Sequence, residues 1–503
     1  MGIVQKDAFR TMLISYGGIV LGYLNKGLLF LLILTTEQIG LVNLIISFGT
    51  MFAQFSNLGT IYSTWKFLPF FKNEAKKHHG FLPLILLIVF VGISFFTALA
   101  LIFRPQIEEM YREHSAMFVS YYYWFIPIGI SYVLFMVLEM YLRSFYKNII
   151  SVVAYDIVLR LAVTLLLGLI YFKLISFDLF VILHSLIYLI PTGILLLYLK
   201  KMGELNLFPS TIQISKRFRK IVLSFSAFNY INTLGVVLVG SMDVIMIAQM
   251  IDLEGTGVYT TIIFLTSALQ VPYKSIIRVS SPLVSDYWKS REIEKMKELY
   301  RKVSSVSLVI GLGLFCGIWN NIDFLFTFFK PEFQSGIWVF FFLMMGRLVD
   351  MYFGINGAIF TTSKKFKYDI YFTCFLIFTV FFLNLRLIPI WGIVGAAIST
   401  SVAILVYNIG RLLFVWFVFK IHPFHKNQFV VISLGLLSLL VGWLTSDLIE
   451  NKYVEFIMQS SFVLTIFFAP IYWFKLEPES VNYLNKGTAF VRSKLGNRKE
   501  KKM

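Results

Sequence analysis

The chain has 503 residues, of which 58% are hydrophobic and only 14% are charged, whereas soluble domains carry about 25% charged residues. Apolar runs of roughly 20 residues recur from end to end, each long enough to cross about 30 Å of hydrocarbon as a helix, so the composition excludes a soluble globular protein. The net charge of +18 does not indicate a nucleic-acid partner, because the basic residues lie mostly in alternate connections between these runs.

We predict an all-α polytopic membrane protein with about fourteen transmembrane helices. The first six span residues 11–35, 39–65, 81–103, 118–142, 150–171 and 177–199. After a basic cytoplasmic linker, 201–220, the next six span 221–250, 256–281, 303–329, 336–360, 367–385 and 392–419. Residues 427–474 supply two more spans, 427–447 and 454–474, and a basic cytoplasmic tail, 475–503, follows them.

The segment after the eighth span is rich in charge. Pro282 is expected to end that span, because proline breaks helices. The run KSREIEKMKELYRK at 289–302 alternates charged and apolar residues, which predicts an amphipathic helix lying along the cytoplasmic surface.

The distribution of basic residues predicts which side each connection faces. Of the 45 Lys and Arg residues, 35 lie at the N-terminus, in the even-numbered connections with their span ends, or in the tail. The odd-numbered connections hold six, and four lie inside spans. Basic loops stay in the cytoplasm, so both termini are predicted to be cytoplasmic, which requires an even number of spans.

An internal repeat relates the first six spans to the second six. TTEQIGLV joins spans one and two, and DLEGTGVY joins spans seven and eight about 217 residues later. FRPQIEEM follows the third span as FKPEFQSG follows the ninth. Six spans return the chain to the same side, so we predict two parallel repeats, an N-lobe (1–200) and a C-lobe (221–420), with the substrate bound between them.

No enzyme motif is present in the sequence: it has no phosphate-binding glycine loop, nucleophile elbow or metal-spaced His/Cys cluster. The histidines are scattered, and His184 alone lies in a predicted span, where a buried structural role is favoured over proton transfer. Cys316 and Cys374 both fall inside spans, so neither a disulfide nor a metal site is expected. The outer loops are short, which disfavours a membrane-embedded glycan polymerase or ligase.

Charged residues inside the spans are the main functional candidates, because ionisable groups at membrane depth are costly and face a cavity or a partner. The basic candidates for binding an anionic substrate are Lys26, Arg160, Arg347, Arg411, Lys274 and Arg278. The acidic candidates for gating or cation coupling are Asp243, Asp350 and Asp156.

Structural pairing is an alternative for two pairs of these residues. Asp156 and Arg160 are four residues apart on one predicted helix, and Arg347 and Asp350 are three apart on another. Residues at these spacings are neighbours on a helix surface, so each pair would neutralise itself. Structure and function both remain open for these four residues.

The other embedded charges have no such partner nearby in the sequence. Lys26 and Arg411 lack a same-helix carboxylate at helical spacing, which favours a functional role. Lys274 and Arg278 lie one turn apart near the inner end of the eighth span, where snorkelling to the interface would also explain them. Asp243 would suit a cation ligand, a salt bridge between the lobes or a gate, and the sequence does not choose between these.

Basic residues outnumber acidic ones among these embedded groups. A cavity lined in this way would attract an anion, and guanidinium groups match phosphate oxygens. Several amide side chains would add hydrogen bonds to a sugar or, equally, join helices to each other: Asn25, Gln54, Asn57, Asn229 and Asn232.

Three stretches resemble the multidrug/oligosaccharidyl-lipid/polysaccharide exporter (MOP) superfamily, and most of all its polysaccharide-transporter (Wzx-type) flippases. They are SMDVIMIAQMIDLEGTGVYTT at 241–261, the segment with Pro282 and the charged run after span eight, and LIPIWGIVGAAISTS at 387–401. Their order and spacing, over spans one to twelve, carry the resemblance.

The resemblance implies two six-helix lobes around a V-shaped cavity, with alternating access. It implies that undecaprenyl-diphosphate-linked oligosaccharide is moved from the inner to the outer leaflet of a bacterial cytoplasmic membrane. Lys26 matches a basic position of the first span, and the last two spans would form a groove for the polyprenyl tail. Partners would be the lipid-linked oligosaccharide, membrane lipids and polysaccharide-assembly proteins.

A drug exporter coupled to protons or sodium is the alternative within this superfamily. Such antiporters usually have twelve spans and use acidic residues for coupling, whereas fourteen spans and an excess of basic residues favour the flippase. Asp243 keeps the alternative open. No cofactor is expected beyond a coupling ion, H⁺ or Na⁺.

Overall fold

The computed structural model describes residues 2–73, 77–206 and 215–476, and every regular element in these ranges is a helix. The chain packs as two compact units. Unit 1 comprises Met1–Phe264 and Ile377–Ala396, and unit 2 comprises Leu265–Leu376 and Ala397–Met503. These two units are defined by contacts within the folded chain. The lobes 1–200 and 221–420 were defined by the internal repeat of the sequence, and this division stays a prediction.

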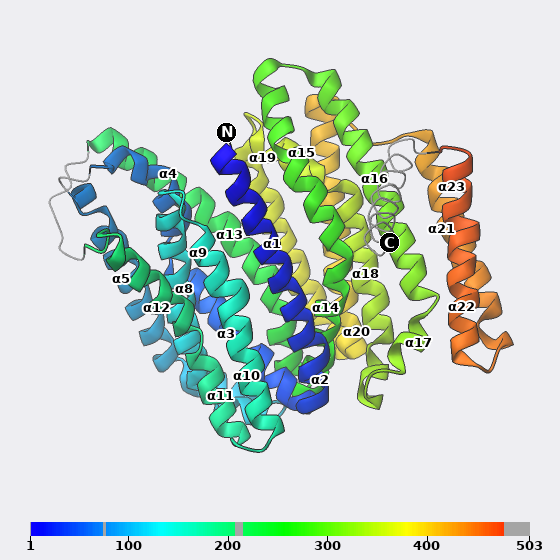
Figure 1. Cartoon of the computed structure of the whole chain (residues 1–503), viewed down its shortest axis with the longest axis horizontal. Coiled ribbons are helices and arrows are strands. Elements are labelled where there is room, and N and C mark those ends of the chain that lie inside the picture. The colour runs from blue at the N-terminus through cyan, green and yellow to red at the C-terminus, as the bar shows by residue number, and fades with distance from the viewer. Residues whose placement is uncertain (1, 74–76, 207–214, 477–503) are drawn as a thin grey trace, which may run out of the picture. The chain divides into compact units, whose positions relative to one another are not determined.

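Unit 1 is built from the helices of the first half together with the seventh predicted span (Figure 1). They are α1 (Gly2–Leu24), α2 (Phe30–Ile33), α3 (Thr36–Ser56), α4 (Thr60–Phe71), α5 (Phe81–Ile102), α6 (Arg104–Arg112), α7 (Ala116–Ser120), α8 (Phe125–Arg143), α9 (Ile149–Val152), α10 (Leu159–Tyr171), α11 (Phe177–Leu186), α12 (Leu189–Lys201), α13 (Lys216–Met250) and most of α14 (Leu253–Thr266). Its core is apolar and lies between α3, α4, α5, α8 and α12, with Phe67, Val89, Leu142 and Leu199 among its buried side chains.

Unit 2 holds the helices that follow α14. They are α15 (Gln270–Ser290), α16 (Ile293–Trp319), α17 (Ile322–Phe326), α18 (Ile337–Phe353), α19 (Ile355–Thr362), the two ends of α20 (Asp369–Phe419), α21 (Lys426–Thr445), α22 (Lys452–Phe462) and α23 (Ala469–Trp473). The last hairpin lies beside α16 (Figure 1), where Leu308 and Leu312 pack against Val431 and Phe467.

Helix α20 joins two predicted spans through one distorted residue. Gly392 has φ +60° and ψ −139° inside this 51-residue helix. Only glycine adopts such angles without strain, and Pro389 also lies in the helix. The break between the spans predicted at 367–385 and 392–419 therefore lies in the sequence PIWG.

Twelve helical segments in the described residues are long and apolar enough to cross a membrane. The all-helical membrane fold is thus confirmed, whereas the count of about fourteen is not. One of the twelve, Phe366–Phe419, is 54 residues long and covers two predicted spans. The span predicted at 256–281 is not among the twelve. In that region a 3₁₀ turn at Ser267–Leu269 lies between α14 and α15.

Two local expectations were wrong. Pro282 lies inside α15 and does not end it. Residues 289–302 do not form a separate surface helix: α15 continues to Ser290, Arg291 takes a left-handed conformation (φ +59°), and α16 runs without interruption from Ile293 to Trp319. The charged run is therefore the tip of a hairpin made by two long helices.

The internal repeat appears in the packing of α3 against α14. A Cβ on Gly40 would lie 1.9 Å from the carbonyl oxygen of Leu253, and a Cβ on Gly257 would lie 2.0 Å from that of Thr36. Gly40 and Gly257 are the corresponding residues of TTEQIG and DLEGTG, as are Thr36 and Leu253. The contact is thus reciprocal, as a two-fold relation between repeats requires.

Candidate functional site

Lys26 lies in a π-helical stretch of the first span. Residues Asn25–Leu29 form this stretch between α1 and α2, and single π-helical turns inside α-helices are frequent at functional sites. The Lys26 ammonium donates a hydrogen bond to Oδ1 of Asn43 on α3 at 3.0 Å. No ion pair of Lys26 exists within the described residues, so its partner there is a neutral amide.

Arg160 and Asp156 form the pair that their spacing predicted. Their charged groups lie 3.7 Å apart, and each side chain is about one quarter exposed. Asp156 belongs to a second π-helical stretch, Val153–Val158, and the Arg160 guanidinium also donates to the carbonyl of Gly18 on α1. The same guanidinium lies against Gly22 of α1, and a Cβ there would displace it.

Asp243 is buried in unit 1, with 3% of its surface exposed. The Tyr259 hydroxyl donates to Asp243 Oδ2 at 2.5 Å, and Asn384 Nδ2 donates to Oδ1 at 2.7 Å. Asn384 is completely buried, and its own Oδ1 accepts no hydrogen bond within the described part of the chain. This cluster is a carboxylate held by two hydrogen bonds beside an amide oxygen.

Arg347 and Asp350 are joined in unit 2 through Gln270 on α15. Arg347 donates to the Thr266 hydroxyl at 3.1 Å and to Gln270 Oε1 at 2.9 Å. The amide nitrogen of Gln270 lies 3.3 Å from Asp350 Oδ2, and that of Asn408 lies 3.4 Å from Oδ1. The structure therefore links the two charges in a network that the i, i+3 spacing alone did not reveal.

Arg411 forms a buried ion pair with Asp369. Its guanidinium donates to both carboxylate oxygens at 2.5–2.8 Å, and the two side chains are 13% and 6% exposed. The guanidinium carbon also lies 4.4 Å from the ring centroid of Tyr407. This pair accounts for Arg411 without a substrate, and its role in substrate binding stays a prediction.

Lys274 and Arg278 are both exposed on α15. They lie one turn apart on the same helix, and within the described residues neither forms an ion pair. This placement fits the snorkelling interpretation, and substrate contact by these two residues stays a prediction.

Several residues of these clusters were not singled out from the sequence. Asn43, Tyr259, Gln270, Asp369, Asn384 and Asn408 hold the embedded charges. Polar residues inside apolar runs were the available signal for Asn384 and Asn408. Asp369 opens α20, 42 residues before Arg411, and no helical spacing connects the two.

Two of the five amides considered for sugar contact join helices or cap a helix break, and a third bonds within its own helix. Asn25 donates to the carbonyl of Arg160 at 2.8 Å. Asn57 accepts from Gly59 N–H at 2.8 Å, at the break between α3 and α4. Asn229 donates to the carbonyl of Phe225 on its own helix. The bonds of Asn25 and Asn57 support a structural role over sugar contact for these two residues.

No protein-family model matches the chain. The "Uncharacterized membrane protein MJ1068" of Methanocaldococcus jannaschii is 24% identical over 475 residues, which cover 87% of this chain and 89% of that protein. Together with the twelve apolar helices, this likeness indicates a multi-pass membrane protein.

Two solved structures have a similar fold. "Lipid II flippase MurJ, inward closed conformation" superposes with a TM-score of 0.70 at 14% identity, covering 93% of this chain and 99% of that one. An "Inward-facing conformation of a multidrug resistance MATE family transporter of the MOP superfamily" gives 0.58 at 14% identity, covering 79% and 93%. The chain thus has the fold of these transporters, as the resemblance in its sequence implied.

Proposed function

We propose that this chain is a flippase of the MOP superfamily that moves undecaprenyl-diphosphate-linked oligosaccharide from the inner to the outer leaflet by alternating access. The fold shared with the lipid II flippase supports a lipid-linked substrate. The Wzx-type specificity comes from the sequence resemblance. The same proposal has both termini in the cytoplasm of a bacterial cell, from the excess of basic residues in the even-numbered connections.

Lys26 is the observation that carries this proposal. Its ammonium is only partly exposed, lies within the first apolar span and hydrogen-bonds to a neutral amide. A cation at membrane depth without a carboxylate is costly, and a diphosphate would supply the missing negative charge, since lysine binds phosphate as a point charge. Arg347, which is held by Thr266 and Gln270, would be a second cation that binds the anionic substrate.

A strain that lacks the gene tests the proposal in cells. We expect the wild-type chain to restore surface polysaccharide, Lys26→Arg to restore part of it, and Lys26→Gln to fail at equal protein level. Lys364→Gln removes the same charge from an exposed loop and should behave as the wild type. Full restoration by Lys26→Gln would contradict the role of this cation.

A cation-coupled multidrug exporter is the second candidate, and the Asp243 cluster favours it. A buried carboxylate next to an amide oxygen would accept a proton or a sodium ion, and the fold is similar to that of a multidrug transporter. In the flippase the same cluster would couple transport to the ion gradient. Altered drug resistance of the deletion strain, with unchanged surface polysaccharide, would favour the exporter.

A further inference from the structure

A cavity of about 590 Å³ lies between α15 and α16 in unit 2. None of the candidate charges described above lines it, although Lys274 and Arg278 lie on the same stretch of α15. Its volume falls within the range of about 300–1,000 Å³ that is usual for small-molecule sites. The two helices are antiparallel, so the groove extends from Ser275 to Tyr287 along α15. That is about 18 Å at 1.5 Å rise per residue.

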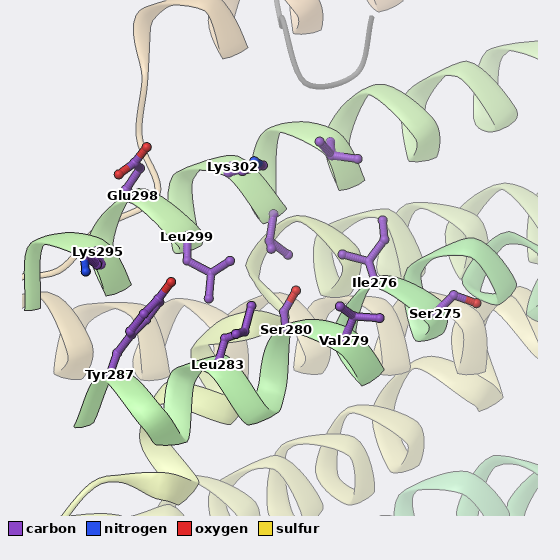
Figure 2. A pocket seen from close by; sticks show the side chains of 12 residues that line it. Ser275, Ile276, Val279, Ser280, Leu283, Tyr287, Lys295, Glu298, Leu299 and Lys302 are labelled. Atoms are coloured by element: carbon purple, nitrogen blue, oxygen red, sulfur yellow. The ribbon is translucent and has the colours of Figure 1, made fainter. Parts of the chain in front are cut away.

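The two ends of the groove differ in polarity. Figure 2 shows Tyr287, Lys295 and Glu298 near one end, and Ile276 and Val279 near the other. The polar end adjoins the hairpin tip at Arg291, and the apolar end leads into the apolar part of α16.

Two apolar side chains of α15 that line the groove face outward. Val279 is 69% exposed and Leu283 is 39% exposed, and Leu299 and Val303 complete the apolar lining from α16. Ser280 has only 5% of its surface exposed, and its hydroxyl points into the cavity (Figure 2). An acyl chain would cover these side chains, and the hydroxyl would reach an ester oxygen.

The hairpin tip next to the polar end carries a net positive charge. Lys295 and Glu298 line this end, and Lys302 lines the groove two helical turns further along α16 (Figure 2). The hairpin tip, residues 286–302, contains six basic and four acidic residues. Lys295 also pairs with Glu292 at 2.8 Å, yet it stays 61% exposed. The positive-inside rule predicts that this end faces the cytoplasm, where the leaflet surface is anionic and attracts basic residues.

We propose that this groove binds one anionic phospholipid of the cytoplasmic leaflet, with its headgroup phosphate between Lys295 and Lys302, two turns apart on α16, and an acyl chain over Val279, Leu283 and Leu299. The charge complementarity selects this occupant. The tail of the chain, 475–503, is itself basic and would be repelled by the same lysines. The test measures lipid binding directly, so it needs no transport.

Binding of phosphatidylglycerol and phosphatidylcholine with the same acyl chains tests the proposal, measured by native mass spectrometry of the purified full chain. We expect one bound phosphatidylglycerol and weaker binding of phosphatidylcholine. The double variant Lys295→Gln/Lys302→Gln should bind phosphatidylglycerol about 30-fold more weakly, from about 1 kcal/mol per basic residue at an anionic surface. Lys364→Gln/Lys365→Gln loses the same charge from another exposed loop and should bind as the wild type.

A second variant, Ser280→Leu, fills the cavity without changing charge. It should reduce binding of both lipids. Its melting temperature without added lipid should equal that of the wild type, and this control shows that the lost binding comes from the filled groove and not from misfolding. Unchanged phosphatidylglycerol binding in the lysine and serine variants would overturn the proposal. Equal binding of the two lipids would overturn its anionic part. Displacement by polyprenyl phosphate alone, or a dimer that buries the groove, would assign another occupant and refute it.

Discussion

The reciprocal contact of Gly40 and Gly257 makes a strong prediction about alanine substitutions. A Cβ on either residue would meet a backbone carbonyl oxygen at 1.9 or 2.0 Å, whereas ordinary van der Waals contact begins near 3.4 Å. The helices α3 and α14 must therefore separate by about 1.5 Å, and a carbonyl cannot rotate away as a side chain would. Overpacking costs about 1–3 kcal/mol, which exceeds the roughly 0.5–1 kcal/mol that alanine gains over glycine in a helix.

We expect Gly40→Ala and Gly257→Ala to lower the free energy of unfolding by a similar amount, about 1–2 kcal/mol net. The double variant should lose less than the sum, because the first alanine already separates the helices for the second. Gly240→Ala is the matched control: nothing lies within 4 Å of a Cβ at that position of α13, so it should stabilise the protein.

Thermal unfolding of the purified chain, followed by tryptophan fluorescence, measures these differences. Melting temperatures of Gly40→Ala and Gly257→Ala that equal or exceed that of Gly240→Ala would refute the close crossing. Strongly unequal losses at the two glycines would refute the reciprocity that relates the repeats.

Two further predictions concern unit 2. Arg411→Gln leaves the Asp369 carboxylate buried without its partner, which typically costs about 3–5 kcal/mol. Folded yield and melting temperature should therefore fall far more than for Arg160→Gln, whose ion pair is longer and more exposed. Adding Asp369→Asn should restore part of the loss, and a wild-type melting temperature for Arg411→Gln would contradict the pairing. Burial, with positive charges on α16, lowers the pKa of His422, so the unfolded state takes up a proton near pH 6.5 before the folded state does. Stability is then complete above that pH and is lost as the pH falls through it, and His422→Phe should show a smaller fall of melting temperature between pH 7.5 and 5.5 than the wild type.

Much of the fold could be predicted from the sequence, because a helix that crosses a membrane must be apolar over its whole length. The apolar runs predicted the positions of most spans. The internal repeat predicted that TTEQIG and DLEGTG are equivalent segments, and the close contact of Gly40 with Leu253 joins these two segments. Local geometry was harder to read. Pro282 lies inside α15 and does not end it. The charged run after it forms the end of α15 and the start of α16, because tertiary packing overrides the local pattern of a short segment.

The candidate charges were also found from the sequence, but their partners were found only in part. The i, i+4 spacing identified Asp156 for Arg160, because one helix brings them together. Asp369 pairs with Arg411 only because α20 and its break bring distant residues together. The structure thus distinguishes a cation satisfied by a carboxylate, Arg411, from one that bonds to a neutral amide, Lys26.

Translocation of a polyprenyl-diphosphate-linked oligosaccharide in proteoliposomes tests the proposed function most directly. The fraction of labelled headgroup that becomes accessible at the opposite leaflet is measured over time for the wild type, Lys26→Gln, Lys26→Arg and protein-free vesicles. We predict rapid movement with the wild type, partial movement with Lys26→Arg, and a rate near that of protein-free vesicles with Lys26→Gln. Wild-type vesicles that leave the lipid-linked oligosaccharide in place, while exchanging a cationic drug for protons or sodium, would contradict the account.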